Sequence, residues 1–414
     1  MIRILPAAQM GRLLARRKAR LAEAEATVRP ILDAVRDRGD KALLEYARRF
    51  DALERKSVVV PAADLQRACT ALSAAFRNAV SIAASNIRAF AEMQLPVETR
   101  REVSPGLQLG QVVRPLDTVA AYIPAGRYPL PSTLMMTVIP AQVARVPNIC
   151  VACPRPVPEI WGTARLLGVD QVFQMGGAQA IAAFAFGTRT VPRADRIVGP
   201  GSIYVAAAKK LLAGEVGIDF VAGPTEILII SGEGNPQFLA ADMLAQAEHD
   251  VDSAAILLTT SKRLANAVAK EIERQLADLP TARVARKAIQ RNGAIIVVRS
   301  LEEAVELSNR FAPEHLSIPD DGLLARVRHA GSVFVGPFST EAAGDYASGP
   351  NHVLPTGGAA RLRGGLSVAD YLKVISVQRL TGEALRALAP AITTLARAEG
   401  LEAHARSVEV RTNG

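Results

Sequence analysis

The feature that most constrains the fold of this chain is a regular alternation of short apolar runs with segments of helical periodicity. It begins at TVAAYIP (118–124) and continues to LEEAVELSNRF (301–311). Apolar runs of this length predict buried strands, and the segments between them carry apolar residues at the spacing of a helix face. Strands joined through helices pair in parallel, because a parallel connection needs a crossover. The sequence therefore predicts an α/β fold with parallel sheets.

The length predicts more than one domain. A chain of 414 residues is too long for a single compact core, so two or three domains are expected. The N-terminal region up to about residue 95 reads as helices, including the basic stretch MIRILPAAQMGRLLARRKARLAEAEA. We interpret this stretch as a mature helix rather than a signal peptide, which makes the cytoplasm the expected compartment. No apolar run reaches the ~18 residues of a membrane span, so no membrane partner is expected.

The charge of the chain does not indicate a nucleic-acid-binding protein. The net charge is +9, but aromatic residues make up only 4% and the basic residues are scattered among acidic ones. The densest cluster, Arg12 to Arg20, is followed by the compensating Glu23 and Glu25. A nucleic-acid binder usually concentrates its charge, so we expect a solvated surface and no nucleic-acid partner.

The cysteines predict neither a disulfide framework nor a redox site. There are only three, Cys69, Cys150 and Cys153. The C-x-x-C pair in VPNICVACPRP has no second pair that would complete a zinc site. Its spacing fits a buried strand that ends at a Pro-rich turn.

Four loops rich in glycine and proline predict a ligand-binding edge. They are PAGRYPLPST, MGGAQA, GPGS and AGPTE, and three of them fall where a strand is followed by a helix. Loops at the carboxyl ends of parallel strands are the usual ligand sites of α/β proteins, and glycines there let backbone N–H groups approach a phosphate. The dinucleotide fingerprint G-x-G-x-x-G is absent, so these loops indicate a phosphorylated ligand without identifying it.

Four of the five histidines lie in dense polar motifs, whereas His329 in RVRHAG reads as a surface residue. The four are His249 in QAEHD, His315 in FAPEHL, His352 in GDYASGPNHVLPT and His404 in EGLEAHARSVEV. A single histidine is usually structural, but four that accompany carboxylates or amides indicate a site.

The spacing in these motifs favours a metal enzyme. Gln246 and His249 are three residues apart, which places both on one helix face as two ligands of one metal. Asp242 shares that face, so the spacing leaves open which carboxylate completes the site. Glu314 and His315 follow a helix and a proline, and on a loop both side chains can enter one cleft. A carboxylate beside an imidazole suits proton transfer near neutral pH.

Several long motifs, in order along the chain, closely resemble those of the histidinol dehydrogenase family. The resemblance runs from about Val28 to His404, and it is carried by GDKALLEYARRFD, PLDTVAAYIPAGRYPLPST, GGAQAIAAFAFGT, RIVGPG, AGPTEILII, QAEHD, FAPEHL, GDYASGPNHVLPTGG, GLSVADYL and EGLEAHA. It implies two successive NAD-dependent oxidations that take L-histidinol through an aldehyde to L-histidine in histidine biosynthesis, with one bound Zn²⁺ per subunit.

The resemblance also implies a role for individual residues. The implied catalytic pair is Glu314 and His315. The implied zinc ligands are Gln246, His249, Asp345 and His404. Those four and His315 also contact substrate, and Thr225, His352 and Glu399 complete the substrate site. The implied cofactor contacts are Tyr122, Gln179 and Ser202. Glu399 and His404 are expected to be supplied in trans, across a homodimer.

For the fold, the resemblance implies two Rossmann-like, incomplete doubly wound domains. Residues 1–121 form a helical region that joins the first α/β domain, and 122–225 form an inserted cofactor domain. Residues 226–366 continue the first domain with the zinc and catalytic residues, and 367–414 form a helical tail.

Four features depart from the family pattern. Ser202 stands where Asn is usual, Ala125 where a second Gly is usual and Gly364 where Ser is more common, and the segment PRPVPEIWGTARLLG is shortened. They leave open a paralogue that oxidises another small amino alcohol with NAD. Two other classes are a zinc-dependent hydrolase, in which Glu314 activates water, and a non-catalytic binding protein, which has no need of the Glu314–His315 pair.

Overall fold

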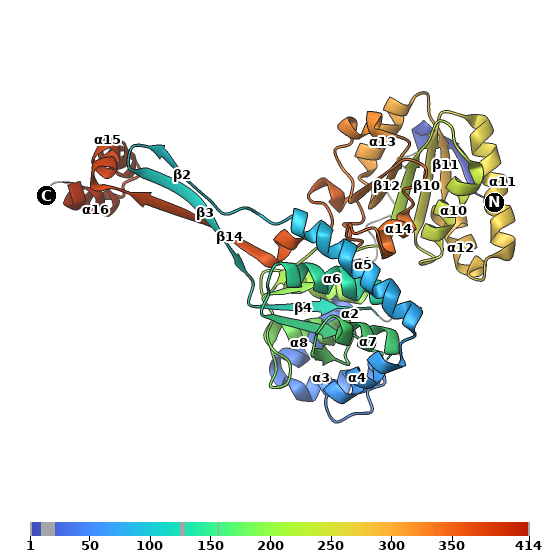
Figure 1. The fold of residues 1–414 in the computed structure, drawn as a ribbon, viewed down its shortest axis with the longest axis horizontal. Coiled ribbons are helices and arrows are strands. Elements are labelled where there is room, and N and C mark those ends of the chain that lie inside the picture. Colours follow the sequence, from blue (N-terminus) through green and yellow to red (C-terminus); the bar gives the residue numbers. More distant parts are fainter. Residues whose placement is uncertain (1, 10–20, 125–128, 156, 413–414) are drawn as a thin grey trace. The chain divides into compact units, whose positions relative to one another are not determined.

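The computed structural model describes residues 2–9, 21–124, 129–155 and 157–412. They belong to two compact units (Figure 1). The first comprises residues up to Gln94 together with Asp117–Tyr371, and the second comprises Leu95–Leu116 together with the chain from Leu372 onward. No helix in the described ranges is both long and apolar enough to cross a membrane.

The first unit contains a five-stranded parallel sheet in the order β6-β5-β4-β7-β8. This is the order of an incomplete Rossmann fold, with β4 at the centre and the direction of winding changing between β4 and β7. Its strands are β4 (Thr118–Tyr122), β5 (Asn148–Ala152), β6 (Gln171–Phe173), β7 (Arg196–Val198) and β8 (Gly217–Ile218).

Helices cover both faces of this sheet. Four of them share one apolar core with the sheet: α2 (Leu21–Arg38), α3 (Asp40–Asp51), α8 (Gly177–Phe186) and α9 (Ile203–Leu212). On the other side lie α6 (Pro131–Val143) and α7 (Pro158–Leu166), with α4 (Ala62–Ala71) and α5 (Ala74–Met93) packed on them. The segment GAQAIAAFAF of α8 is apolar all round because sheet and helices enclose it.

A six-stranded parallel sheet forms the other part of the first unit, in the order β1-β11-β10-β9-β12-β13. In β9 (Glu226–Ile230) every residue is buried, and successive side chains enter opposite cores. The other strands are β1 (Arg3–Pro6), β10 (Ala254–Thr259), β11 (Ala294–Val297), β12 (His315–Ile318) and β13 (Ser332–Val335).

The helices around this sheet also form two layers. One layer holds α10 (Pro236–Ala247), α11 (Lys262–Asp278) and α12 (Ala282–Asn292). The other holds α13 (Leu301–Phe311) and the 3-10 helix η2 (Asp321–Arg326). Short elements complete the unit: η1 (Ala7–Gln9), α14 (Glu341–Tyr346), η3 (Ala359–Arg361) and η4 (Val368–Tyr371).

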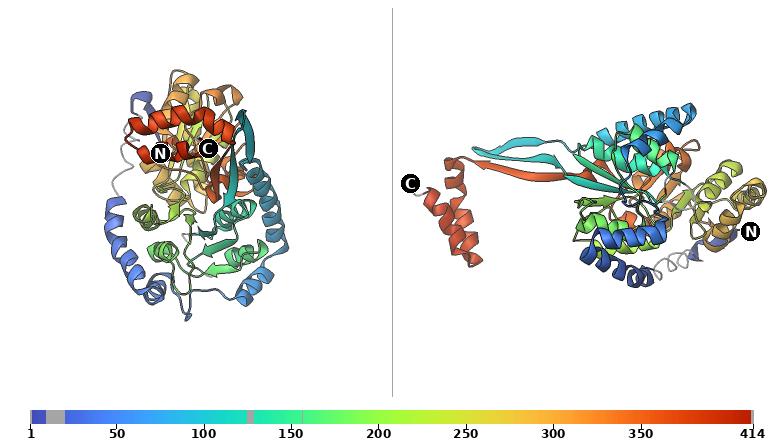
Figure 2. Two further views of the ribbon diagram at one scale, coloured as in Figure 1. Left: turned by 90° about the vertical axis from the view of Figure 1, so that its left-hand side faces the viewer. Right: turned by 90° about the horizontal axis from the view of Figure 1, so that it is seen from below.

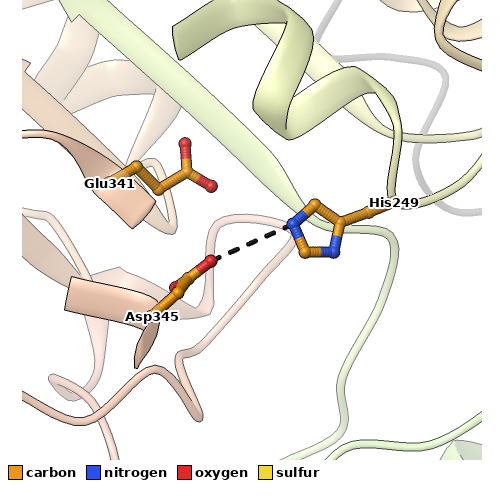
Figure 3. A group of neighbouring side chains, drawn as sticks. All are labelled: His249, Glu341 and Asp345. Carbon is orange, nitrogen blue, oxygen red and sulfur yellow. Dashed lines mark ion pairs between the residues drawn. The ribbon is translucent and has the colours of Figure 1, made fainter. Parts of the chain in front are cut away.

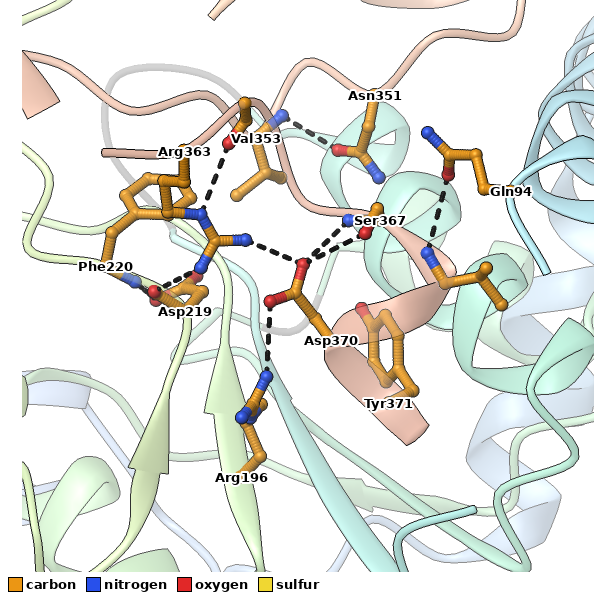
Figure 4. Close-up of polar contacts among 12 residues, drawn as sticks. Gln94, Arg196, Asp219, Phe220, Asn351, Val353, Arg363, Ser367, Asp370 and Tyr371 are labelled. Carbon is orange, nitrogen blue, oxygen red and sulfur yellow. Dashed lines mark hydrogen bonds and ion pairs between the residues drawn. The ribbon is translucent and has the colours of Figure 1, made fainter. Parts of the chain in front are cut away.

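The segment that ends the first unit is bound to the Rossmann-like part by polar contacts (Figure 4). Arg363 donates to the backbone carbonyl of Asp219 at 2.7 Å and to the carboxylate of Asp370 at 2.7 Å. Arg196, on β7, donates to the same carboxylate at 3.2 Å. The hydroxyl of Tyr371 donates to the carbonyl of Thr137 in α6 at 2.8 Å. The two α/β parts of the first unit are therefore joined by side chains as well as by the chain.

The second unit combines an antiparallel sheet with two helices (Figure 2). Its sheet has the order β14-β3-β2, formed by β14 (Leu372–Leu380), β3 (Leu107–Pro115) and β2 (Thr99–Ser104). The turn between β2 and β3 contains Gly106 at φ +72°, where a Cβ atom would overlap the hydroxyl of Thr381. The helices α15 (Gly382–Ala398) and α16 (Glu402–Thr412) pack on each other.

The α/β class with parallel sheets is confirmed, but three expectations of helix are wrong. Residues 3–6 form strand β1, which pairs with β11, and residues 99–115 form strands β2 and β3. The segment expected to be a helical tail begins with η4 and strand β14 before its two helices. Strands β1 and β14 pair with partners distant in sequence, which a local pattern does not show, whereas β2 pairs with the adjacent β3. The basic cluster 12–20 and Ala125 lie outside the described residues.

Candidate active site

A cluster of polar side chains lies at the amino-terminal edge of the six-stranded sheet. Thr225 immediately precedes β9, and Glu314 immediately precedes β12, which begins at His315. Gln246 lies in the last turn of α10, because a helix that follows a parallel strand returns to the amino end of the sheet. His249 lies in the turn just beyond the end of α10, so the two residues do not share one helix as the spacing predicted. This edge is opposite to the one that the general rule for α/β sheets favours.

The two residues of the expected catalytic pair are both buried, with Glu314 6% and His315 3% exposed. The Oε2 atom of Glu314 accepts from the backbone N–H of Glu226 at 2.7 Å and from the hydroxyl of Thr225. His315 Nδ1 lies 3.2 Å from the carbonyl oxygen of Glu226. Since a carbonyl oxygen only accepts, Nδ1 carries a proton.

The other ring nitrogen of His315, Nε2, is buried and has no hydrogen-bond partner among the described residues. Its nearest charged neighbour is Asp345 Oδ1, at 3.6 Å. In the neutral imidazole this nitrogen holds the lone pair. The fold therefore presents a basic nitrogen inside a buried site, which is the arrangement that general-base chemistry needs.

The side chains of the cluster hold protons tightly. Burial raises the pKa of Glu314. Burial alone would lower the pKa of His315, but the carboxylates of Glu341, Glu314 and Asp345 together raise it to about 10. Burial also raises the pKa of Glu341, to about 8. A cation bound among these carboxylates would favour release of the protons and so leave Nε2 of His315 free to act as a base.

Three side chains form a group with metal-ligand spacing (Figure 3). One ligand atom each from His249, Glu341 and Asp345 lies within 4.8 Å of the others. His249 Nε2 is 3.9 Å from Asp345 Oδ2. Glu341 and Asp345 are four residues apart on α14 and share a helix face. Asp242, which the spacing left open as a ligand, is not in this group.

Gln246 is fully buried beside this group. In one orientation its Nε2 donates to the hydroxyl of Thr225 at 2.6 Å, and its amide oxygen faces the carboxylate of Glu341. With the amide turned over, Nε2 donates to Glu341 instead. The second orientation satisfies both ends of the amide, because its oxygen then accepts from the backbone N–H of Glu226 and from the hydroxyl of Thr225. An amide, an imidazole and carboxylates are a fitting donor set for zinc.

His352 joins the cluster to the Rossmann-like part. Its Nδ1 lies 2.8 Å from the backbone carbonyl of Asp345, and its Nε2 lies 3.1 Å from the hydroxyl of Thr133 in α6. Burial lowers the pKa of this imidazole.

Glu399 and His404 belong to the second unit, at the end of α15 and in the first turn of α16, where both are exposed. The group His249, Glu341 and Asp345, by contrast, lies entirely in the first unit.

The three expected cofactor contacts lie at the carboxyl edge of the five-stranded sheet. Tyr122 ends β4, Gln179 lies in the first turn of α8, and Ser202 is the exposed N-cap of α9. The hydroxyl of Tyr122 accepts from the backbone N–H of Gly177 at 3.1 Å. Gly199 adopts φ +108°, and a Cβ atom there would overlap the carbonyl oxygen of Tyr122. This edge is the switch point where Rossmann folds bind dinucleotides.

Reasoning from the sequence missed two residues of these sites. Glu341 was missed although its i, i+4 spacing with Asp345 is a recognisable signal on a helix. Asp51 accepts hydrogen bonds from Gly176 and Gln179, but no local pattern indicates that it reaches a turn 125 residues away.

A Rossmann-like switch point, where dinucleotides bind, and a buried imidazole beside carboxylates, which suits proton transfer, are the two parts that a dinucleotide-dependent dehydrogenase needs. The sequence profile described as histidinol dehydrogenase matches residues 14–412. The chain therefore belongs to the histidinol dehydrogenase family of oxidoreductases.

Individual relatives agree with this assignment. Histidinol dehydrogenase of Geobacter sulfurreducens is 46% identical over 98% of this chain and 97% of its own length. That of Syntrophotalea carbinolica is also 46% identical, over 98% and 96%. The crystal structure of histidinol dehydrogenase from Elizabethkingia anophelis has a TM-score of 0.93 at 36% identity, and covers 100% of this chain and 98% of that one.

Proposed function

We propose that this protein oxidises L-histidinol to L-histidine through the aldehyde, with two NAD⁺ per histidinol, as a step of histidine biosynthesis in the cytoplasm. The observation that carries the proposal is the buried His315, whose Nε2 lacks a hydrogen-bond partner among the described residues, beside the group His249, Glu341 and Asp345. Membership of the histidinol dehydrogenase family supports the choice of substrate.

The zinc ligands in this proposal are Gln246, His249 and Asp345 from the first unit and His404 from the second. Bound zinc supplies Lewis-acid character, which orients and polarises an alcohol that has nitrogen atoms nearby. The grouping of His249, Glu341 and Asp345, with one ligand atom of each close to the others, supports a cation at this place.

His315 carries the proton chemistry. Its Nε2 takes the hydroxyl proton of histidinol while hydride leaves the carbon that bears this hydroxyl and passes to NAD⁺, which gives the aldehyde. His315 returns that proton to the carbonyl oxygen as water adds to the aldehyde, and Glu314 accepts a proton from that water, which gives the hydrate. His315 then takes a hydroxyl proton of the hydrate as the second hydride leaves for a second NAD⁺. This gives the carboxylic acid, which ionises to the carboxylate. Thr225, which donates to Glu314, holds the acceptor oxygen in place.

The remaining contacts divide between substrate and cofactor. Thr225, His352 and Glu399 complete the substrate site. Tyr122, Gln179 and Ser202 contact the dinucleotide, and their position at the Rossmann switch point supports this role. Glu399 and His404 come from the partner subunit of a homodimer, which makes the dimer the active species.

The stoichiometry of NADH tests this function. Purified protein with zinc, NAD⁺ and L-histidinol should form two NADH for each histidine, and histidinal should yield one. A panel that includes other small amino alcohols and NADP⁺ is the control. Preference for another alcohol would identify a paralogue, and histidinol left unchanged with no NADH formed would refute the proposed reaction.

A further inference from the structure

We propose that Asp51 is a positioning residue for the dinucleotide site. It fixes the side-chain amide of Gln179 and the turn at Gly176 and Gly177, so that this edge of the sheet is ordered before the cofactor binds. The inference rests on the proposed function, because it takes Gln179 and Tyr122 as cofactor contacts.

A single carboxylate oxygen of Asp51 holds both groups. Its Oδ2 accepts from the backbone N–H of Gly176 at 2.9 Å and from Nε2 of Gln179 at 3.0 Å. Asp51 is the last residue of α3, which ends at Ala52 in a left-handed conformation with φ 51°. The carboxylate therefore comes from α3, which is distant in sequence from the turn between β6 and α8 that it holds.

The turn itself has little freedom. At Gly176 a Cβ atom would lie 2.9 Å from Asp51 Oδ1 and 2.7 Å from a carbon of Pro154, so a larger residue does not fit. Gly177 has φ +58°, a conformation that L residues rarely adopt. Its N–H donates to the hydroxyl of Tyr122. One turn thus connects both proposed cofactor contacts, and Asp51 is the charged group that anchors it.

The hydrogen bond to Asp51 also decides which end of the Gln179 amide is available. A carboxylate only accepts, so Nε2 must face Asp51 and Oε1 must face away. An acceptor is then left for a donor of the bound molecule, such as a ribose hydroxyl. Without Asp51 the amide could turn over and present the wrong end.

The surroundings of Asp51 agree with a functional role. Burial raises its pKa to about 6. No ion pair with Asp51 is present in the described parts of the chain, and a half-buried carboxylate held only by N–H groups is costly to stability. A cavity of about 660 Å³ adjoins it, lined by residues that include Phe50, Arg55 and Gln174, so a bound molecule has access to this side of the turn.

The test compares Asp51→Ala with Asp51→Asn. The alanine variant should bind NADH about tenfold more weakly, the effect of losing ~1.4 kcal/mol of hydrogen bonding to a charged group. The KM for NAD⁺ should rise in parallel, with kcat and the KM for histidinol nearly unchanged. Asp51→Asn should retain most of the affinity, because its amide oxygen can occupy the place of Oδ2. NADH fluorescence measures binding independently of turnover.

A double-mutant cycle shows whether Asp51 acts through Gln179. On a Gln179→Ala background, Asp51→Ala should weaken NADH binding by clearly less than on the wild-type background. The matched control is Asp40→Ala, at the other end of α3, which loses hydrogen bonds to Thr190 and should leave NADH binding unchanged.

Each result has a separate meaning. Unchanged NADH binding in Asp51→Ala, or full additivity with Gln179→Ala, would overturn the inference. If Gln179→Ala also has no effect, the proposed cofactor contact itself fails. If Asp51→Ala does not fold, Gln179→Glu replaces it as the test. That change should weaken NADH binding by carboxylate repulsion, and adding Asp51→Asn should restore it; no restoration would contradict the inference.

Discussion

At the scale of single residues, the fold gives the two nitrogens of His315 different surroundings. The carbonyl of Glu226 keeps Nδ1 protonated, and Nε2 has no hydrogen-bond partner in the described ranges. The preceding residue, Glu314, accepts hydrogen bonds through one of its two oxygens. In the proposed mechanism these adjacent residues act on different protons.

The two half-reactions should respond differently to changes in this pair. His315→Ala should slow oxidation of both histidinol and histidinal by about 10²–10⁴-fold, the usual contribution of a general base. Glu314→Gln should slow histidinal oxidation much more than histidinol oxidation, because only the second step consumes water. Rates of NADH formation from each substrate measure this. Equal losses on both substrates in Glu314→Gln would refute the role given to Glu314.

Metal binding should depend on His249. His249→Ala should lose most of the zinc, which we expect at about one per subunit, while keeping its fold, because the imidazole supplies one of only four ligands. Metal analysis after dialysis measures zinc, and circular dichroism measures the fold. His329→Ala, remote in sequence from the proposed ligands, is the control. Full zinc retention in His249→Ala would exclude the proposed ligand set.

The sequence predicted part of this site, and the limits are physical. Gln246 and His249 were recognisable from their spacing at the end of a helical pattern, although His249 lies in the turn just after α10. Asp345 could not be preferred to Asp242 without the resemblance, since α14 is brought to α10 only by the tertiary fold. Asp51 was missed for the same reason.

At the scale of elements, the turn between β7 and α9 is held by a buried ion pair. Lys209 and Asp219 have side chains only 3% and 0% exposed. Lys209 donates to the carbonyl oxygen of Gly199 at 3.0 Å, and Asp219 accepts from the backbone N–H of Gly199 at 2.7 Å. The pair thus binds both backbone polar groups of Gly199. It supports the loop between Gly199 and Ser202, which we propose contacts the cofactor.

Breaking this pair should destabilise the protein strongly. Lys209→Met should lower the free energy of unfolding by about 3–5 kcal/mol, because it leaves Asp219 as an unpaired buried charge. The adjacent Lys210 pairs with Glu25 at the surface, with 51% of its side chain exposed, and Lys210→Met should cost about 0–1 kcal/mol. Urea unfolding curves compare the two. Similar losses in both variants would contradict the role of burial.

Elements with strong local patterns were predicted well. The run EILII, apolar after Glu226, and the helical spacing in α10 left little choice, because both reflect burial of a complete strand or face. Strands β1 and β14 were not predicted. Half or more of the residues in β14 are exposed, so the hydrophobic pattern is weak and the hydrogen bonds to β3 determine the structure.

At the scale of the whole molecule, the second unit joins two distant stretches of sequence. Residues 107–115 pair with 372–380 in antiparallel register. No local signal connects these segments, so the domain boundaries expected from the sequence could not include this unit. The second unit also carries Glu399 and His404. The main question about assembly is whether these two residues complete the site of their own chain or that of a second copy.

Mixing two inactive variants tests the shared site. His404→Ala and His315→Ala should each be inactive alone as homodimers. After subunit exchange, a heterodimer with a site shared in trans holds one intact site and one doubly damaged site, so activity should return toward a quarter of the wild-type level at equal mixing. Native mass spectrometry, with one variant labelled with ¹⁵N because the two variants have the same mass, confirms exchange. Exchange without recovery would show that each tail serves its own chain.

The pairing of β1 with β11 has a consequence for synthesis on the ribosome. Arg3 lies opposite Ala294, so the first strand made waits for a partner that is translated near the end of the first unit. At ~5–20 residues per second this interval is on the order of tens of seconds. The five-stranded sheet, by contrast, is encoded without interruption between residues 118 and 218, and all its strands emerge well before β11. The nascent chain can therefore complete the five-stranded sheet first. The six-stranded sheet, which carries Glu314 and His315, forms its β1–β11 pairing only afterwards.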